Sequence, residues 1–260
     1  MTAAAPGPRP PGRPGDTAGV FRALHHDRAP GDPLVLPGPW DAAAARVFAE
    51  AGFPALATPS AGIAASLGYA DGRTPAGEML AAVARIARAV DVPVSADVED
   101  GYGLAPRELV ERLLEAGAVG CNLEDSRDGV LTDPQAHADR LAEVRAAAGD
   151  RLFVNARVDV FLHGRGDPDR TVGSALERAA LYVAAGADCV YPIGAPPRAL
   201  PRLRAGTPGP LNALAALDGE GPSPAVLGGL GATRVTFGPG LQRRATAALR
   251  EIAARVRRDP

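Results

Sequence analysis

The sequence predicts one α/β domain folded as a single (β/α)8 TIM barrel. Short apolar segments rich in strand-forming residues alternate with longer segments of helical spacing, and about eight such apolar segments occur. Eight parallel strands are what a closed barrel of this type needs, and 260 residues suit one such domain. The predicted strands lie at residues 34–36, 55–57, 92–96, 119–123, 152–156, 188–191, 210–213 and 234–237.

The junctions between helices and strands favour a parallel sheet. A glycine separates a helical segment from the next apolar one at four places: Gly52, Gly117, Gly186 and Gly231. Glycine suits the left-handed conformation that often follows a helix. An open doubly wound sheet is the alternative, but no Gly-x-Gly-x-x-Gly motif opens the first unit, so we favour the barrel. Helices are expected between the strands, for example over residues 106–116, 172–185 and 198–204.

Composition excludes several kinds of chemistry. All 28 basic residues are arginine, because the chain contains no lysine. Schiff-base catalysis, pyridoxal phosphate attachment and the Gly-Lys-Ser/Thr phosphate loop all need a lysine amine, so they are excluded. With 30 acidic residues the net charge is −2, which argues against a nucleic-acid partner and against a basic membrane anchor.

The distribution of residue types predicts the domain organisation. Residues 1–19 are rich in proline and glycine without an apolar core, so we expect a disordered tail rather than a secretory signal. Residues 20–260 are the predicted barrel domain, and no apolar stretch in them is long enough to span a bilayer. Cys121 and Cys189 lie in apolar runs, which indicates two buried thiols in a reducing compartment and a cytoplasmic protein.

Acidic side chains cluster where neighbouring predicted strands end. Asp97 and Glu99 follow the third strand, Glu124 follows the fourth, and Arg157 follows the fifth. The carboxyl ends of barrel strands meet at one mouth, where the chemistry of such barrels takes place. Carboxylates gathered there repel one another unless a cation lies between them, and oxygen ligands without histidine select Mg²⁺ or Mn²⁺. The alternative is structural, because single acids such as Asp41 also cap helices and acid–arginine pairs form networks at barrel rims.

Several motifs in order along the chain resemble the isocitrate lyase/phosphoenolpyruvate mutase superfamily. They occupy residues 37–41 (Pro-Gly-Pro-Trp-Asp), 60–68, 97–103 (Asp-Val-Glu-Asp-Gly-Tyr-Gly), 124–125 and 156–159. The resemblance implies a (β/α)8 barrel that binds a 2-oxo acid through Mg²⁺. It also implies that a C–C or P–C bond is made or broken through a pyruvate-type enolate. Family members commonly form tetramers with helix exchange, so the resemblance implies a homo-oligomer.

The resemblance further implies roles for individual residues. Asp97 matches the main metal-site aspartate, Glu99 and Asp71 match further metal-site acids, and Glu124 matches an acid that holds metal-bound water. Arg157 matches the arginine that contacts the substrate carboxylate or the developing oxyanion. Donors placed where charge develops are what an enolate needs. The loop whose backbone N–H groups would hold the oxo-acid carboxylate comprises Ser60, Ala61 and Gly62.

The segment after Glu124-Asp125 departs from the family pattern. Lyases of the family carry Lys-Lys-Cys-Gly-His there and phosphonate mutases carry a lysine-containing segment, whereas residues 126–133 contain neither lysine nor cysteine. This departure argues against isocitrate or methylisocitrate as the substrate. Tyr102 is a candidate general acid, because a phenol can donate a proton to a carbanion; ordering of the adjacent glycine loop is the alternative role.

Three further candidates for the substrate pocket are Trp40 and Asp41, which follow the first predicted strand, and Asn212, near the end of the seventh. Packing at the barrel end or rim is the alternative for Trp40 and Asn212, and helix capping is the alternative for Asp41. The leading hypothesis is a Mg²⁺-dependent lyase or decarboxylase that acts on a small 2-oxo or 2-hydroxy acid. A mutase or hydrolase acting on the P–C bond of phosphonopyruvate is the first alternative, and a non-catalytic oxo-acid-binding barrel is the second. A dimer or tetramer is expected, because the Ala/Leu face of the last helix, over residues 241–258, must be buried.

Overall fold

The computed structural model describes residues 14–26, 28–29, 31–163, 167–217 and 221–257. Within these residues, eight parallel strands form a closed ring of two sheets. The two sheets are joined on both sides. A β-bridge between Val190 and Leu211 joins them on one side. On the other side, the Ala57 N–H group donates to Pro37 O at 3.1 Å. The predicted barrel is therefore confirmed. One sheet contains, in order, β1 (Leu34–Val35), β10 (Arg234–Thr236) and β9 (Asn212–Leu214). The second contains β2 (Leu56–Thr58), β3 (Val94–Asp97), β4 (Gly120–Glu124), β7 (Phe153–Arg157) and β8 (Cys189–Tyr191).

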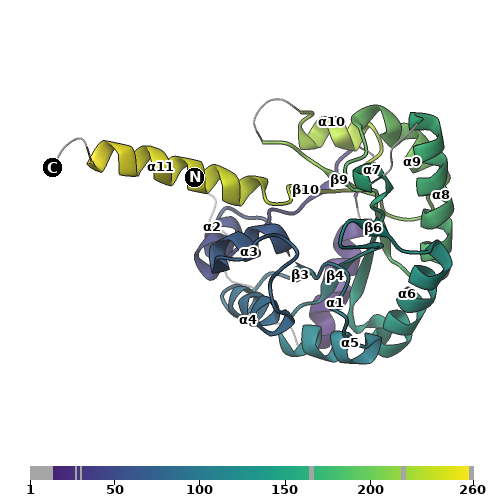
Figure 1. Ribbon diagram of the computed structural model, residues 1–260, viewed down its shortest axis with the longest axis horizontal. Helices are drawn as coiled ribbons and strands as arrows, with labels where there is room; N and C mark the ends of the chain where they lie inside the picture. The colour runs from purple at the N-terminus through teal and green to yellow at the C-terminus, as the bar shows by residue number, and fades with distance from the viewer. Residues whose placement is uncertain (1–13, 27, 30, 164–166, 218–220, 258–260) are drawn as a thin grey trace, which may run out of the picture.

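Helices surround the ring of strands (Figure 1). Their apolar faces pack inward, as in α5 (Pro106–Glu115), where Leu109, Val110 and Leu113 are buried. The four predicted glycine junctions all have left-handed φ angles, between 80° and 107°, so they are confirmed. The short helix predicted near residue 200 is also present, preceded by the 3₁₀ turn η2 (Pro197–Ala199). The outer helices are α2 (Ala42–Glu50), α4 (Ala76–Ala87), α5 (Pro106–Glu115), α6 (Pro134–Ala148), α8 (Pro168–Ala184), α9 (Leu200–Gly206) and α10 (Pro224–Gly229).

Short elements that the sequence did not predict follow strands at the carboxyl end of the barrel. The helix α3 (Ser60–Leu67) occupies the segment where a carboxylate-binding loop is expected, so residues 60–62 form its first turn instead. Alanine-rich composition explains the helix, because alanine has the highest helix propensity. The other elements are the hairpin of β5 (Ser126–Arg127) and β6 (Val130–Leu131), and α7 (Val160–His163); the 3₁₀ turn η1 (Gly149–Arg151) precedes β7.

The helix α1 (Pro14–His26) closes the amino end of the barrel. Its Phe21 ring is fully buried and lies edge-on to Phe153, the first residue of β7, with centroids 5.3 Å apart. His25 stacks on the same Phe153 ring at 4.1 Å. The barrel interior is thus sealed at this end, and access from solvent is through the carboxyl end.

The position of α1 corrects the predicted boundary of the N-terminal tail. Residues 14–19, which were expected to be disordered, belong to this helix, and Ala18 is buried. Proline is tolerated in the first turn of a helix, where its missing N–H group would have no partner, so proline-rich composition does not exclude a helix that begins there. The remainder of the predicted tail, residues 1–13, lies outside the described residues.

The last helix, α11 (Gly240–Val256), extends away from the barrel (Figure 1). None of its described residues is buried, and Leu249, Ile252 and Val256 are 63%, 48% and 68% exposed. It therefore carries an apolar face that the described part of the chain leaves uncovered. Over the described ranges, no helix combines the length and apolar character needed to cross a membrane.

The buried His25 predicts a loss of stability in acid. Its Nδ1 lies 2.8 Å from Phe21 O, and burial lowers its pKa from 6.5 to about 3. The unfolded chain therefore takes up a proton below pH 6.5 that the folded chain refuses, so stability falls as pH falls from 6.5 towards 3. At pH 5 this residue should cost about 2 kcal/mol relative to pH 7.

Denaturant titrations at pH 7 and pH 5 test this prediction. His25→Phe should lose that part of the pH dependence, whereas His26→Phe, at the exposed neighbouring position, should behave as the parent does. The same pH dependence in all three proteins would show that His25 is not the responsible group.

Candidate active site

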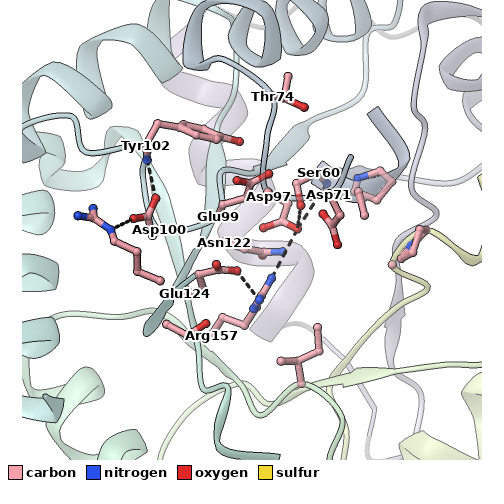
Figure 2. Close-up of a pocket in the computed structure, with 18 of the residues that line it drawn as sticks. Ser60, Asp71, Thr74, Asp97, Glu99, Asp100, Tyr102, Asn122, Glu124 and Arg157 are labelled. Atoms are coloured by element: carbon pink, nitrogen blue, oxygen red, sulfur yellow. Dashed lines mark hydrogen bonds and ion pairs between the residues drawn. The ribbon is translucent and has the colours of Figure 1, made fainter. Parts of the chain in front are cut away.

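A cavity of about 940 Å³ opens at the carboxyl ends of the strands, where the sequence predicts the site. Its acids and its inner arginine face a common space (Figure 2). They come from β3, β4, β7 and the loop before α4, which the closed ring brings together. The predicted site residues that line it are Ser60, Ala61, Asp71, Asp97, Glu99, Tyr102, Glu124 and Arg157.

Arg157, the last residue of β7, is the inner cation of this cavity. Its Nε and Nη2 atoms donate to the two carboxylate oxygens of Asp159, both at 2.7 Å, and Nη2 is also paired with Glu124 Oε2. The Nη1 atom lies 3.9 Å from Asp97 Oδ2 (Figure 2). Arg157 and Glu124 meet because they are register partners in the β7–β4 pair. Burial acts to lower the pKa of Arg157, but its hydrogen bonds to Asp159 and the nearby carboxylates outweigh this and raise the pKa, so the guanidinium stays charged.

Asp159 orients the Arg157 side chain, a role that was not predicted from the sequence. Ser126 Oγ donates to Asp159 Oδ2 at 2.7 Å, so the carboxylate is held from both sides. The Asp159 N–H group donates to Asp125 Oδ1 at 2.8 Å. The two-residue spacing between Arg157 and Asp159 is a signal that could have found it, because alternate residues of an extended segment share one side.

Asp125 links this arrangement to helix α8. Its side chain is fully buried, and Oδ2 accepts from Arg178 Nη1 at 2.8 Å and from the Tyr182 hydroxyl at 2.7 Å. Neighbouring residues of a strand point to opposite faces, so Glu124 reaches the cavity while Asp125 reaches the surrounding helices. The Glu-Asp motif therefore combines a cavity residue with an anchor.

Asp97, the last residue of β3, has one occupied and one free carboxylate oxygen. Ser60 Oγ donates to Oδ2 at 2.8 Å, and the Ser60 N–H group lies 3.5 Å from the same oxygen. Asp97 Oδ1 is buried and has no hydrogen-bond partner in the described part of the chain. Ser60 thus orients Asp97 and leaves Oδ1 open for a ligand.

The turn after β3 places Glu99 and Tyr102 in unusual backbone conformations. Their φ angles are 51° and 56°, in the left-handed region that costs a non-glycine residue about 1–3 kcal/mol. Asp100 Oδ1 accepts from the Tyr102 N–H group at 2.8 Å and so stabilises the turn. Glu99 Oε1 and the Tyr102 hydroxyl are buried without a hydrogen-bond partner among the described residues. Strained backbone and unpartnered polar atoms at one cavity are typical of a functional site.

Two carboxyls of the cavity, those of Glu99 and Glu124, hold their protons more tightly than free carboxyls do. Burial, followed by the charges of Asp97 and Asp71, raises the pKa of Glu99 to about 7. Loss of solvent likewise raises the pKa of Glu124, although Arg157 opposes the rise. The pKa of the Tyr102 phenol is raised by burial and by the surrounding carboxylates, so it stays protonated at neutral pH.

The carboxylates suit a Mg²⁺ ion that keeps much of its water. Asp97 Oδ1 and Glu99 Oε1 are free to accept a cation or its water. Within the described ranges, no three acidic, histidine or cysteine side chains form a set that could hold a metal directly. Mg²⁺ commonly retains several waters and takes only one or two protein carboxylates, so the residues present fit a hydrated ion at Asp97. Glu99, Asp71 and Glu124 would then accept from its waters.

Four predicted pocket residues lie outside the cavity lining. Asp41 accepts from the Ala44 N–H group at 2.7 Å and caps α2, which is the structural alternative for this residue. Trp40 lies beside it, in a groove between α2 and α11. Gly62 is buried in the first turn of α3, and Asn212 is buried inside the barrel.

Two ion pairs hold the rim of the cavity. Arg127, in the β5–β6 hairpin, pairs with Asp100 after β3. Arg73, before α4, lies 3.5 Å from Asp128 at the tip of the same hairpin. The hairpin occupies the segment that departs from the family pattern. These ion pairs attach it to the loop after the neighbouring strand β3 and to the loop before α4.

Comparison with known proteins places these features in a family. The family model for phosphoenolpyruvate phosphomutase matches residues 21–257. An uncharacterized protein of Mycobacterium tuberculosis H37Rv is 37% identical over 221 residues, which are 84% of this chain and 81% of that protein. The 2-methylisocitrate lyase of Aeropyrum pernix is 34% identical over 66% of this chain and 57% of its own length. A crystal structure of a Burkholderia cenocepacia J2315 protein assigned as a phosphonomutase is 39% identical, with a TM-score of 0.83 over 94% of this chain and 99% of that one.

The free carboxylate oxygens predict stabilisation by Mg²⁺. At a free Mg²⁺ concentration one hundred times its Kd, the folded chain should gain about 2.7 kcal/mol, which thermal unfolding would report as a higher Tm. Asp97→Ala should remove most of the rise, whereas Asp128→Ala, at the exposed rim, should keep it. An unchanged Tm of the parent at saturating Mg²⁺ or Mn²⁺ would exclude the metal site.

Proposed function

The chain belongs to the isocitrate lyase/phosphoenolpyruvate mutase superfamily, and we propose that it is a Mg²⁺-dependent enzyme that makes or breaks a C–C bond of a small 2-oxo or 2-hydroxy acid. The bond would change through a pyruvate-type enolate. One observation carries this proposal: charged Arg157 and the free oxygens of Asp97 and Glu99 belong to one cavity. An enolate needs these two components, a fixed cationic donor and a site for a Lewis acid.

Arg157 is the proposed oxyanion and carboxylate donor. Two of its nitrogens are held by Asp159, so its guanidinium plane is fixed before substrate arrives. Fixed donors stabilise developing charge without reorganisation, which is the main source of this kind of catalysis. Bound Mg²⁺ would supply Lewis-acid polarisation of the oxo oxygen. Ser60 keeps Asp97 in the direction needed to hold that ion.

Tyr102 is the proposed general acid. Its hydroxyl is buried in the cavity wall and, over the described residues, has no hydrogen-bond partner. Its raised pKa keeps the proton on the phenol until a carbanion accepts it. Glu124 is the second group that can carry a proton, but its Oε2 is occupied by Arg157.

Chemistry at a P–C bond is the alternative function. The matching family model is that of phosphoenolpyruvate phosphomutase, and a structure 39% identical to this chain is assigned as a phosphonomutase. The same cavity could hold a phosphonopyruvate enolate. We favour C–C chemistry because cleavage or decarboxylation needs only a Lewis acid and fixed donors such as Arg157 to hold the enolate. Residues 126–133 also lack the lysine-containing segment that phosphonate mutases carry, as they lack the corresponding segment of isocitrate lyases.

An assay of product release separates these functions. Purified protein with Mg²⁺ is given hydroxy diacids, oxaloacetate or phosphonopyruvate, and pyruvate, phosphoenolpyruvate and inorganic phosphate are measured. Release of an oxo acid from a diacid supports the lyase or decarboxylase, and turnover of phosphonopyruvate alone supports the P–C alternative. Oxalate binding without turnover of any of these compounds would indicate a non-catalytic oxo-acid-binding barrel.

A homo-oligomer is proposed from the exposed face of α11. Leu249, Ile252 and Val256 recur at helical spacing on a helix that extends beyond the barrel (Figure 1). A second copy of the chain is the proposed cover for this face.

The two cysteines bear on the location of the protein. Because Cys121 and Cys189 are buried free thiols, a cytoplasmic location is proposed as well.

Light scattering tests the proposed assembly. The parent chain at micromolar concentration should be a dimer or tetramer, and Leu249→Asp with Ile252→Asp should shift it towards monomer because charges would replace the apolar face. Glu251→Ala, on the same helix, is the matched control. A monodisperse parent monomer would contradict the assembly.

Arg157→Lys tests the enolate donor. Lysine keeps the positive charge but loses the two-pronged geometry, so turnover should fall on the order of a hundredfold or more, the usual effect of losing one oxyanion donor. Oxalate, a planar mimic of the pyruvate enolate, should inhibit the parent competitively and the variant far less. Arg127→Lys, at the exposed rim, is the control and should stay near parent activity. Normal turnover and oxalate sensitivity in Arg157→Lys would make Arg157 a structural ion-pair residue.

A further inference from the structure

A group of buried polar side chains lies one step deeper in the barrel than Glu124 and Arg157. Asn122 precedes Glu124 by two residues on β4, and Asn155 precedes Arg157 by two residues on β7. Because alternate residues of a strand share one face, the side chains of Asn122 and Asn155 also point into the barrel, below those of Glu124 and Arg157. The group also includes Arg234, which is fully buried. Asn122 is the member that also lines the cavity wall beside Asp97, its register partner on β3.

Arg234 determines which way the Asn122 amide points. Arg234 Nη2 donates to Asn122 Oδ1 at 3.2 Å, and Asn155 Nδ2 donates to the same oxygen at 2.8 Å. A guanidinium has donors only, so the Asn122 oxygen must face it; the reversed amide would set donor against donor.

Asn122, Asn155 and Asn212 form a row of hydrogen-bonded amides, and Asn212 fixes the orientation of the Asn155 amide. Asn212 Nδ2 donates to Ala213 O at 2.9 Å and to Thr236 Oγ1 at 3.0 Å. Because the Ala213 carbonyl only accepts, the Asn212 oxygen must face Asn155, whose Nδ2 donates to it at 3.2 Å. The three amides therefore have one common direction, set by a carbonyl at one end and a guanidinium at the other.

This arrangement presents the Asn122 N–H₂ group to the cavity. Its oxygen is occupied twice, and its nitrogen has no hydrogen-bond partner in the described ranges. Figure 2 shows the Asn122 amide among Asp97, Glu124 and Arg157. We propose that Asn122 binds the substrate by donating an amide N–H to an oxygen of the oxo acid, and that Arg234 and Asn155 are positioning residues that hold this amide. The inference rests on the proposed function, because it takes the oxo acid as the ligand of this cavity.

An uncharged donor suits this place. It can bind an anionic oxygen beside Arg157 without adding a cation next to a metal site. Arg234 itself has no ion-pair partner within the described residues, and its Nε and Nη1 atoms are buried without hydrogen bonds. A buried charge without a counter-ion does not stabilise a fold. We therefore assign two other roles to Arg234: its hydrogen bond orients Asn122, and its positive charge lies beneath a cavity that would bind an anion.

Calorimetric titration of oxalate at saturating Mg²⁺ tests the role of Asn122. Asn122→Ala should bind oxalate about tenfold or more weakly, the usual effect of losing a hydrogen bond to a charged group. Asn122→Asp keeps an acceptor for Arg234 and Asn155 but turns oxygen towards the cavity, so it should fold as stably as the parent and still bind oxalate weakly. Parent-like oxalate affinity in Asn122→Ala overturns the role while leaving the proposed function intact. A parent that binds no oxalate overturns the proposed function and this inference with it.

A double-mutant cycle tests the positioning role of Arg234. Arg234→Met should fold, because apolar replacement of a buried charge is often neutral or stabilising, and it should weaken oxalate binding in the parent background. In the Asn122→Ala background the same change should have little further effect, since the amide it orients is gone. Arg234→Lys, which retains a donor, should recover most of the affinity. Equal losses in both backgrounds, no loss from Arg234→Met in the parent, or a loss from Arg234→Lys as large as that from Arg234→Met would overturn the positioning role.

Discussion

The burial of several carboxylates around one arginine is the constraint on which the rest of this structure depends. Like charges removed from water raise one another's proton affinity, as the pKa of Glu99 near 7 shows. Arg157 offsets this repulsion through Asp159, Glu124 and Asp97, and its own charge is secured in return. A site of this kind remains short of positive charge, which is the condition that makes it receptive to a divalent cation.

The barrel supplies this arrangement by strand register and by anchors outside the cavity. The β7–β4 pairing sets Arg157 opposite Glu124, and the adjacent Asp125 connects the same strand to Arg178 and Tyr182 of the outer helix layer. Alternation along each strand thus separates cavity residues from those that hold them. The closed amino end, sealed by α1, leaves the carboxyl end as the place where ligands enter.

Much of the fold and the inner site could be predicted from the sequence, because both depend on strand periodicity. Apolar segments located the eight strands, and polar residues at their ends located Asp97, Glu124 and Arg157. Tertiary contacts decided the rest. Asp41 caps a helix, a role that its position after a strand does not distinguish from ligand binding. The direction of the Asn122 amide depends on Arg234, which is 112 residues away in the chain. The predicted tail boundary was wrong because α1 begins at residue 14 and packs Phe21 and His25 against Phe153. Composition reports only local preference and does not show such a tertiary contact.

A crystal structure of the protein with Mg²⁺ and oxalate is the most direct test of the proposal that Arg157 and the carboxylates around it form an enolate site. The expected result is Mg²⁺ bound to Asp97 at about 2.1 Å, with oxalate completing its coordination and accepting from Arg157. Oxalate bound outside the cavity, or a metal held without Asp97, would contradict this view of the site.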